Sequence, residues 1–232
     1  MSNTRWTLPD VWNRLVRAAL PQDCLLCGAW SGDAPLCAPC FGDLPSLPPA
    51  CPVCAMPSPC GAVCGSCMSD PPRFDATVAA WRYAYPVDLL VHSLKFHGRL
   101  ALAALFAQAL AGRAARADIV IAMPLHPARL SERGFNQAAE IARRLARLKG
   151  STLLCEGARR IRHTLPQAGL ALPERQRNVR GAFACDRSFA GLRVAVVDDV
   201  MTTGATLGEL AKVLKRAGAA RVENWVVART LD

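Results

Sequence analysis

The sequence predicts a parallel α/β domain preceded by a small cysteine-rich module, and three observations support this fold class. Nine of the eleven cysteines lie between residues 24 and 67, most of them in CxxC pairs. After Pro72, short apolar runs alternate with helix-length amphipathic runs, the pattern of a parallel sheet with helices on both faces. One apolar run leads into "DDVMTTGAT" (198–206), and parallel sheets hold ligands at such strand ends.

The cysteines form an internal repeat. Two CxxC pairs separated by nine residues recur, in the same spacing, 27 positions further along the chain. Two such pairs supply the four thiolates of a tetrahedral zinc site. The repeat therefore predicts a double zinc ribbon with two structural Zn²⁺ sites, built from Cys24, Cys27, Cys37, Cys40, Cys51, Cys54, Cys64 and Cys67.

The repeat leaves two points open. An interleaved arrangement would use the same eight cysteines, so the spacing does not decide which pairs share a metal. Cys60 can replace Cys64 as a ligand or take no part, and the repeat favours Cys64. Cys155 and Cys185 lie alone in the second domain and are interpreted as buried packing thiols.

Length and charge divide the chain in the same way. The 232 residues suffice for one sizeable domain and a smaller module. Residues 1–72 contain three arginines and five aspartates, a net charge of −2, whereas the remainder carries +12. A basic C-terminal part indicates an anionic partner such as a phosphate, a nucleotide or a nucleic acid. We expect an N-terminal helical segment (1–21), a double zinc ribbon (22–72) and an α/β domain (73–232).

No stretch has the pattern of a signal peptide or a membrane span. Four charged residues interrupt residues 1–20, and the apolar stretch 100–112 is too short to cross a bilayer. We expect no membrane insertion and a cytoplasmic location, where cysteines bind metals or stay free rather than form disulfides.

The elements of the second domain follow the linker Pro71-Pro72. Apolar runs predict strands at 75–84, 118–124, 193–199 and 221–229. Amphipathic or apolar runs predict helices at 87–96, 100–116, from 136 or 137 to about 147, and at 206–217, with 125–135 as a loop. Gly218 ends the last helix, because glycine readily adopts the left-handed conformation that follows a helix.

The acid pair Asp198-Asp199 needs an explanation, because adjacent carboxylates repel each other. The turn that follows offers threonine hydroxyls and the free N–H groups of a helix N-terminus, which together bind phosphate. Carboxylates beside a phosphate can accept hydrogen bonds from the vicinal hydroxyls of a ribose. The turn lacks the GxxxxGK[ST] pattern of a nucleotide P-loop. A helix-capping role explains one aspartate but not the "TTGAT" that follows, so we favour a phosphoribosyl site.

Residues 194–206 resemble the phosphoribosyl pyrophosphate (PRPP) binding motif of the type I phosphoribosyltransferases. From residue 22 to 231 the chain resembles the ComF family, competence-associated phosphoribosyltransferase-like proteins with an N-terminal double zinc ribbon. The resemblance is carried by the CxxC series, "HSLKFHGR" (92–99), "PLHPARLSERGFNQ" (124–137), "RIRHTLPQAGL" (160–170), "RQRNVRGAF" (175–183) and "VVDDVMTTGAT" (196–206). It implies a type I phosphoribosyltransferase-like fold and a role in DNA uptake with the competence machinery.

Residue by residue, the resemblance implies a site for PRPP or a phosphoribosyl nucleotide, with Mg²⁺ bound mainly through ligand oxygens. Asp198 and Asp199 would contact the ribose hydroxyls, and the 5′-phosphate would lie against Thr202, Thr203, Gly204, Ala205 and Thr206. A pyrophosphate loop would run from about 125 to 133 with Leu125, His126, Arg129 and Arg133, and Lys95 can reach the same pocket. A flap at 160–181 would supply Arg162, Arg175, Arg177 and Arg180 for anion binding.

One departure from the family pattern affects the chemistry. Purine-type phosphoribosyltransferases often carry a carboxylate at the position of Thr202, where it accepts a proton from the base; a threonine, as in orotate-type enzymes, cannot do this. His126 and His163 are substitutes in principle, although a lone histidine more often has a structural role. Three function classes stay open: transfer of ribose 5-phosphate from PRPP to an unknown acceptor, single-stranded DNA binding, and PRPP sensing without turnover.

Overall fold

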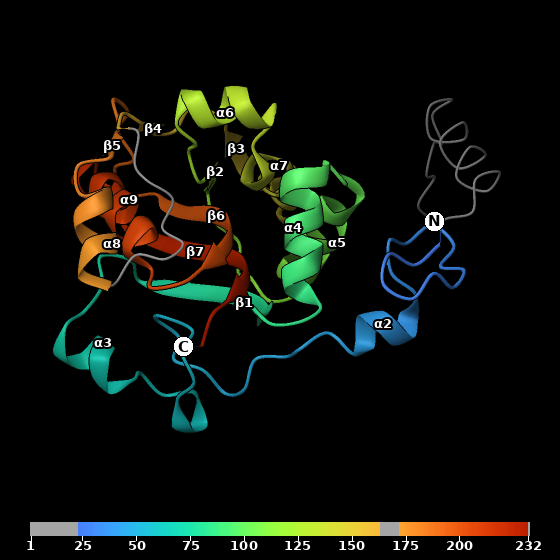
Figure 1. Ribbon diagram of the computed structural model, residues 1–232. Helices are drawn as coiled ribbons and strands as arrows, with labels where there is room; N and C mark the ends of the chain where they lie inside the picture. The colour runs from blue at the N-terminus through green and yellow to red at the C-terminus, as the bar shows by residue number, and fades with distance from the viewer. Residues whose placement is uncertain (1–22, 163–171, 232) are drawn as a thin grey trace, which may run out of the picture. The chain divides into compact units, whose positions relative to one another are not determined.

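The computed structural model describes residues 23–162 and 172–231 (Figure 1). The N-terminal helical segment expected at 1–21 and the candidate base His163 lie outside these residues. The chain divides into two compact units, Met1–Leu44 and Pro45–Asp232, which are described separately below. The first four cysteines of the repeat belong to the first unit and the other four to the second. The sequence-based domain limits at 22 and 72 stay a prediction.

The first unit is small and built from tight turns around its cysteines. Its one helix within residues 23–44 is α2 (Ala38–Gly42), a single turn that begins directly after Cys37. The backbone N–H of Gly28 donates to the carbonyl of Cys24 at 2.9 Å, which closes the turn of the first CxxC pair. Gly28 has φ 73°, a conformation that glycine adopts without the Cβ clash of other residues. Such a unit has little room for an apolar core.

The second unit contains a five-stranded parallel sheet with strand order β1-β7-β6-β2-β3 (Figure 1). Its strands are β1 (Ala76–Arg82), β2 (Ile119–Ala122), β3 (Thr152–Leu154), β6 (Arg193–Met201) and β7 (Arg221–Arg229). A separate two-stranded antiparallel sheet consists of β4 (Arg159–Arg160) and β5 (Phe183–Ala184). The parallel order confirms the predicted α/β class.

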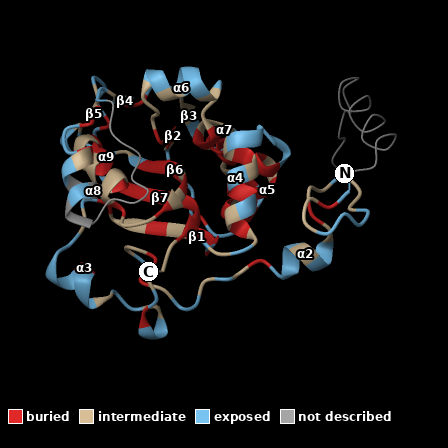
Figure 2. Ribbon diagram, viewed as in Figure 1, coloured by how far each residue is buried: buried red, intermediate tan, exposed pale blue. Residues whose placement is uncertain are grey.

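Helices cover both faces of the parallel sheet (Figure 1). The described helices of this unit are α3 (Gly65–Ser69), α4 (Val87–His97), α5 (Ala101–Ala111), α6 (Pro127–Arg133), α7 (Gln137–Lys149), α8 (Leu172–Val179) and α9 (Ala205–Arg216), with a short 3-10 turn at η1 (Pro59–Gly61), and α5, α7 and α9 contact the sheet. Helices α5 and α7 pack on each other and on the sheet, while α8 packs on α9. Figure 2 shows that the buried residues concentrate in the central strands and in the helix surfaces that face them.

Strand β6 is buried on both faces, and its alternation orients the acid pair. Val194 and Val196 pack in one core cluster with Leu207 and Leu210 of α9. Their neighbours Ala195 and Val197 are 0% exposed and point to the opposite face, because successive strand residues alternate. The strand continues to Met201, two residues further than predicted. Asp198 therefore faces the α9 side, and Asp199 faces the α7 side.

The structure differs from the predicted elements around residues 125–135. The stretch expected to be a loop contains α6, which begins at Pro127 and ends where Gly134 adopts φ 78°. Proline is favoured at the first position of a helix and glycine just after its end, so both ends of α6 follow ordinary helix chemistry. Strands β3, β4 and β5 and helix α8 were not predicted, because each is short or mainly polar.

Helix α7 begins as the sequence predicts. The side-chain Oδ1 of Asn136 accepts hydrogen bonds from the backbone N–H groups of Ala138 and Ala139 at 3.0 and 3.3 Å, and so caps the helix.

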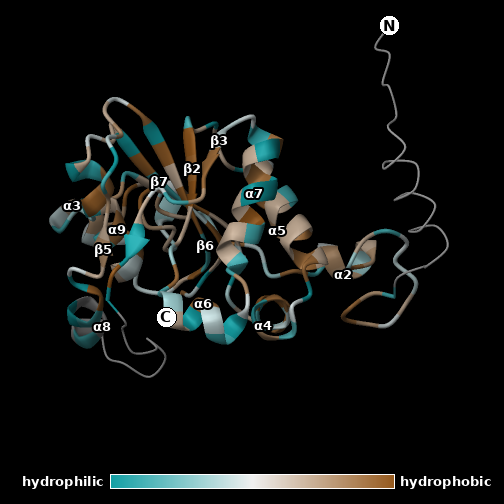
Figure 3. Cartoon of the chain, turned by 90° about the horizontal axis from the view of Figure 1, so that it is seen from above, coloured by the Kyte–Doolittle hydropathy of each residue, from teal (hydrophilic) through white to brown (hydrophobic). Residues whose placement is uncertain are grey.

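Figure 3 shows that the hydrophobic residues lie mainly in the strands and the adjoining helix faces. Among the residues that the structure describes, no helix has both the length and the apolar character needed to cross a bilayer.

Candidate functional site

The cysteines form two separate four-thiol groups. Cys24, Cys27, Cys37 and Cys40 make up the first group, and Cys51, Cys54, Cys64 and Cys67 make up the second; within each group all Sγ atoms lie within 4.8 Å of one another. Each group thus combines two CxxC pairs that are neighbours in the sequence. The interleaved alternative left open by the spacing is excluded, and the predicted double zinc ribbon is confirmed.

Both groups fit a zinc ion. With Zn–S bonds of about 2.3 Å, the sulfurs of a regular tetrahedron lie about 3.8 Å apart. The Cys27–Cys37 and Cys54–Cys64 Sγ distances are 3.7 and 3.6 Å. Burial raises the pKa of Cys51, but backbone N–H donors, the first of them from Cys64, outweigh it and lower that pKa to about 6. A thiol stabilised as a thiolate in this way is ready to bind metal.

The remaining three cysteines lie outside these groups. Cys60 is exposed on η1, so Cys64 and not Cys60 completes the second group. Cys185 is half-buried, and its Sγ donates to the carbonyl of Gly157 at 3.2 Å. The interpretation of Cys155 as a buried packing thiol was wrong: it is exposed, because it directly follows β3 at the edge of the sheet.

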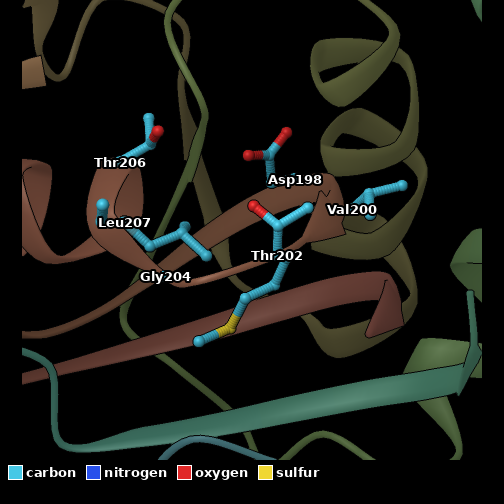
Figure 4. A pocket seen from close by; sticks show the side chains of 8 residues that line it. Asp198, Val200, Thr202, Gly204, Thr206 and Leu207 are labelled. Carbon is cyan, nitrogen blue, oxygen red and sulfur yellow. The ribbon is translucent and has the colours of Figure 1, made fainter. Parts of the chain in front are cut away.

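The predicted phosphate loop connects β6 to α9 and lines a small open pocket of about 40 Å³. Asp198, Thr202, Gly204, Ala205 and Thr206 are among its lining residues. Figure 4 shows the carboxylate of Asp198 and the hydroxyl of Thr206 on the same side of the loop. Helix α9 begins at Ala205, so the N–H groups of its first turn lie beside these oxygens. The pocket thus combines a helix N-terminus, hydroxyls and one carboxylate.

Glycine is required at position 204. Gly204 has φ 78°, and a Cβ there would lie 2.7 Å from Met201 Cε. The side chain of Thr203 also stabilises the turn, because its Oγ1 accepts from the N–H of Ala205 at 3.3 Å. The loop therefore packs closely against Met201, and its backbone lines the pocket.

The two aspartates have different surroundings. Asp199 is 6% exposed; its Oδ2 accepts from Gln137 Nε2 at 3.0 Å and lies 3.7 Å from Lys95 Nζ. Gln137 in turn accepts from Arg133 Nη1 at 2.7 Å. Asp199 thus joins α4 and α7 to the sheet, whereas Asp198 lines the pocket. Burial, and next the charge of Asp199, raise the pKa of Asp198 well above its usual range.

Two arginines, Arg133 of α6 and Arg160 of β4, lie within electrostatic reach of this acid pair, and both also lie near Arg129 of α6. Burial lowers the pKa of Arg160, Arg129 lowers it further, and Asp198 acts in the opposite direction. Burial also lowers the pKa of Arg133, which Asp199 raises and Arg129 lowers. Arg160 thus lies near the charge of Asp198, Arg133 lies near those of Asp199 and Glu132, and both lie near the charge of Arg129. Such a cluster of cations suits a ligand that carries several negative charges.

The predicted pyrophosphate-loop and flap residues lie on several different elements. Leu125 and His126 precede α6, and the N–H of Ala128 donates to Nδ1 of His126 at 3.3 Å, so this histidine caps the helix. Arg162 donates to the carbonyl of Arg180, which ties the two ends of the predicted flap together. Arg177 and Arg180 are exposed. Arg175 lies on α8, at a position whose side chain is outside the described part.

Sequence reasoning missed two residues of this region. Gln137 was assigned to the start of a helix and to the end of the 124–137 motif, without a role in the site, yet its amide bridges Arg133 and Asp199. Arg229 was assigned only to a strand, yet it is 4% exposed and donates to the carbonyl of Met201 at the start of the loop. An arginine directly after the apolar run 225–228 at the end of a strand, beside a predicted ligand site, is the signal that would have indicated the second residue.

Comparison with solved structures gives low similarity scores. The chain is 22% identical to a glutamine PRPP amidotransferase from B. subtilis complexed with ADP and GMP, covering 53% of this chain and 25% of that one, with a TM-score of 0.38. It is 17% identical to a purine phosphoribosyltransferase from Pyrococcus horikoshii, covering 67% and 89%, with a TM-score of 0.32. The parallel strand order β1-β7-β6-β2-β3 establishes the fold class without these matches.

Comparison with known sequences shows the family. A family model described as "Double zinc ribbon domain" matches residues 15–68. The DNA utilization protein YhgH of Salmonella typhimurium is 34% identical, with 84% of this chain and 91% of that protein covered. The Competence protein F of Haemophilus influenzae is 33% identical, with 72% and 78% covered. The chain belongs to the ComF family, in which these DNA utilization and competence proteins are its relatives.

Proposed function

We propose that the α/β domain binds PRPP or a phosphoribosyl nucleotide together with Mg²⁺. The observation that carries this proposal is the pocket at the β6–α9 turn, where Asp198 and Thr206 lie beside the N-terminus of α9. In this arrangement the N–H groups and hydroxyls of residues 202–206 hold the 5′-phosphate. The carboxylate of Asp198 accepts hydrogen bonds from the ribose hydroxyls, and Asp199 positions that part of the strand.

The cations supply the second half of the proposed site. Arg129, Arg133 and Arg160 hold the pyrophosphate, and their charge together with Mg²⁺ would stabilise it as a leaving group in any transfer of the ribose phosphate. Magnesium fits here because oxygen ligands suit it, and Asp198 and the pyrophosphate offer oxygens. The acceptor of such a transfer is not part of the proposal.

The test is a calorimetric titration of the zinc-loaded protein with PRPP in the presence of Mg²⁺. PRPP should bind more tightly than ribose 5-phosphate or pyrophosphate, because it uses both halves of the site. Thr206→Val should weaken binding of PRPP and ribose 5-phosphate by about 0.5–1.5 kcal/mol, the usual net contribution of one hydrogen bond, and leave pyrophosphate unaffected. Thr152→Val, on the edge strand β3, is the matched control. PRPP binding no tighter than pyrophosphate would contradict the proposal.

A second candidate function is binding of single-stranded DNA in the context of DNA uptake. Two observations favour it: the relatives' names refer to DNA utilization and competence, and exposed arginines concentrate near α8. The partners would then include the competence machinery. We also propose a cytoplasmic location, because free thiols and thiolate-bound zinc are typical of reducing compartments.

The arginines near α8 separate the two functions. If they contact DNA, replacing Arg175, Arg177 and Arg180 with alanine should reduce the slope of log affinity against log salt by about 0.7 for each lost phosphate contact. If they close over pyrophosphate instead, which we favour, the same variant should keep its DNA affinity and lose PRPP affinity. A variant with Arg113, Arg116 and Arg147 replaced by alanine has the same net charge and serves as control. Unchanged affinity for both ligands would show that the three residues are solvated surface.

A further inference from the structure

Arg229 connects the second four-cysteine group to the phosphate loop. It is the last residue of β7 and is 4% exposed. Its Nε donates to the carbonyl oxygen of Cys54 at 2.9 Å. Its Nη1 donates to the carbonyl of Met201 at 3.2 Å and also to that of Thr202. One planar guanidinium therefore fixes a metal-binding turn and the first residues of the loop relative to each other.

Apolar packing makes the same connection. Ala55, the residue after Cys54, belongs to the core cluster that also contains Phe74, Met201 and Leu207. A Cβ at Gly204 would lie 2.7 Å from Met201 Cε and 3.5 Å from Phe74 Cζ, so the loop lies directly on these side chains. Close-packed interiors transmit small displacements, because they contain few voids to absorb them. A shift of the turn at Cys54 therefore reaches the loop.

The shape of this turn depends on its four thiolates. Ala55 has φ 58°, a left-handed conformation that is unfavourable for alanine and must be imposed by its surroundings. The N–H of Cys64 donates to Cys51 Sγ at 3.3 Å, and the N–H of Ala55 donates to the carbonyl of Cys51 at 2.9 Å. A tetrahedral metal holds the four sulfurs and hence this backbone in place. Loss of the metal removes that constraint from the carbonyl of Cys54.

We propose that metal occupancy of the second four-cysteine group determines how firmly the 202–206 loop binds phosphate, and that Arg229 is the positioning residue that couples the two. The inference rests on the proposed function of the loop. It assigns no such role to the first group, which belongs to the other unit. Coupling between two sites is reciprocal, so a ligand on the loop must also help to retain the metal.

The first test measures zinc release from the second group in the full chain carrying Cys37→Ser, where the first group has lost a ligand. With a coloured chelator in excess, PRPP and Mg²⁺ should slow this release at least about fivefold, the low end of ordinary coupling between sites. Arg229→Lys keeps the charge but lacks the planar guanidinium that donates to the carbonyls of both Cys54 and Met201. In this variant PRPP and Mg²⁺ should therefore change the rate of zinc release less than about twofold. Arg82→Lys, the exposed register neighbour on β1, should behave like the parent.

Amide hydrogen exchange separates a failure of the coupling from a failure of the proposed ligand. Without any ligand, removing zinc should speed exchange at least about fivefold in the parent at Ala205 and Gly208, whose N–H groups donate to Thr203 Oγ1 and to the carbonyl of Gly204. In Arg229→Lys these amides should exchange fast even with zinc bound, while those of α7 stay protected. If exchange responds in this way but PRPP leaves zinc release unchanged, the coupling stands and the ligand is wrong. Equal exchange with and without zinc in the parent overturns the inference, and so does an Arg229→Lys chain that behaves like Arg82→Lys.

Discussion

The Asp198→Asn variant is expected to bind PRPP more weakly than the wild type and to unfold at a higher temperature. Loss of a charge-assisted hydrogen bond to the ribose should cost about 1.5–3 kcal/mol, roughly a 10- to 150-fold decrease in affinity. Stability should change in the opposite direction, because burial and Asp199 raise the pKa of Asp198 and so make its ionised form unfavourable in the folded state. In a chain of this size each 1 kcal/mol raises Tm by about 2–4 °C. Calorimetric titration and thermal unfolding measure the two effects.

The pH dependence distinguishes this explanation from a general effect of substitution. A raised pKa means that the folded state binds the proton of Asp198 more tightly than the unfolded state. The wild type therefore loses stability as pH rises from about 4, the pKa of an unfolded aspartate, through the raised value. The Tm advantage of Asp198→Asn should be largest at neutral pH and should vanish near pH 4. A Tm difference of the same size at every pH would contradict the explanation that the raised pKa of Asp198 causes it.

Asp199→Asn is the informative comparison, because this carboxylate has protein partners. Its Oδ2 accepts from Gln137 and lies 3.7 Å from Lys95 Nζ, so the substitution removes an ion pair and places an amide against an amide. We expect a lower Tm than the wild type at neutral pH. If the two substitutions change Tm in opposite directions, Asp199 stabilises the folded strand, whereas Asp198 destabilises it and has its role in ligand binding.

The sequence predicted the β6–α9 region well, because its signals are local. A run of buried valines, two acids and a Thr/Gly turn lie within 13 residues and need no distant partner to be recognised. The difference between the two aspartates was not predicted. It depends on which helix packs on each face of β6, since alternation points Asp198 toward α9 and Asp199 toward Gln137 of α7. The boundary of a strand is set by its neighbours in the sheet, here by the pairing of Met201 with Arg229.

Long-range contacts explain what else the sequence did not predict. The bond from Arg229 to the carbonyl of Cys54 joins residues 175 positions apart, and neither residue type indicates the other. The boundary between the two compact units lies between Leu44 and Pro45, where the sequence shows no change of composition, and the domain limit at 72 stays a prediction. The content of proline and cysteine describes only the local composition of the chain. It does not report that the backbone N–H of Thr77 in β1 donates to the carbonyl of Pro52 at 3.0 Å.

Removal of zinc is expected to unfold the first unit while the parallel sheet stays folded. Within residues 23–44 the buried hydrophobic side chains are those of Cys24, Leu36 and Leu44, too few to offset the conformational entropy of folding. Zinc binding in such modules supplies about 10–16 kcal/mol, which is then the folding free energy of the unit. With a strong chelator, limited proteolysis should cut within residues 23–44 and leave the strands of the second unit intact.

Two serine variants make this experiment specific to the first group. Cys37→Ser should reproduce the effect of the chelator on residues 23–44 while zinc stays in the second group, so elemental analysis should fall from about two zinc ions per chain to about one, as expected for two four-thiolate sites. Cys60→Ser should change neither the zinc content nor the proteolysis pattern, because this exposed thiol lies outside both groups. Protection of residues 23–44 after complete loss of zinc would mean that packing, and not metal binding, stabilises the unit. Three buried side chains make that outcome physically unfavourable, and the second unit differs because its sheet is covered by helices on both faces.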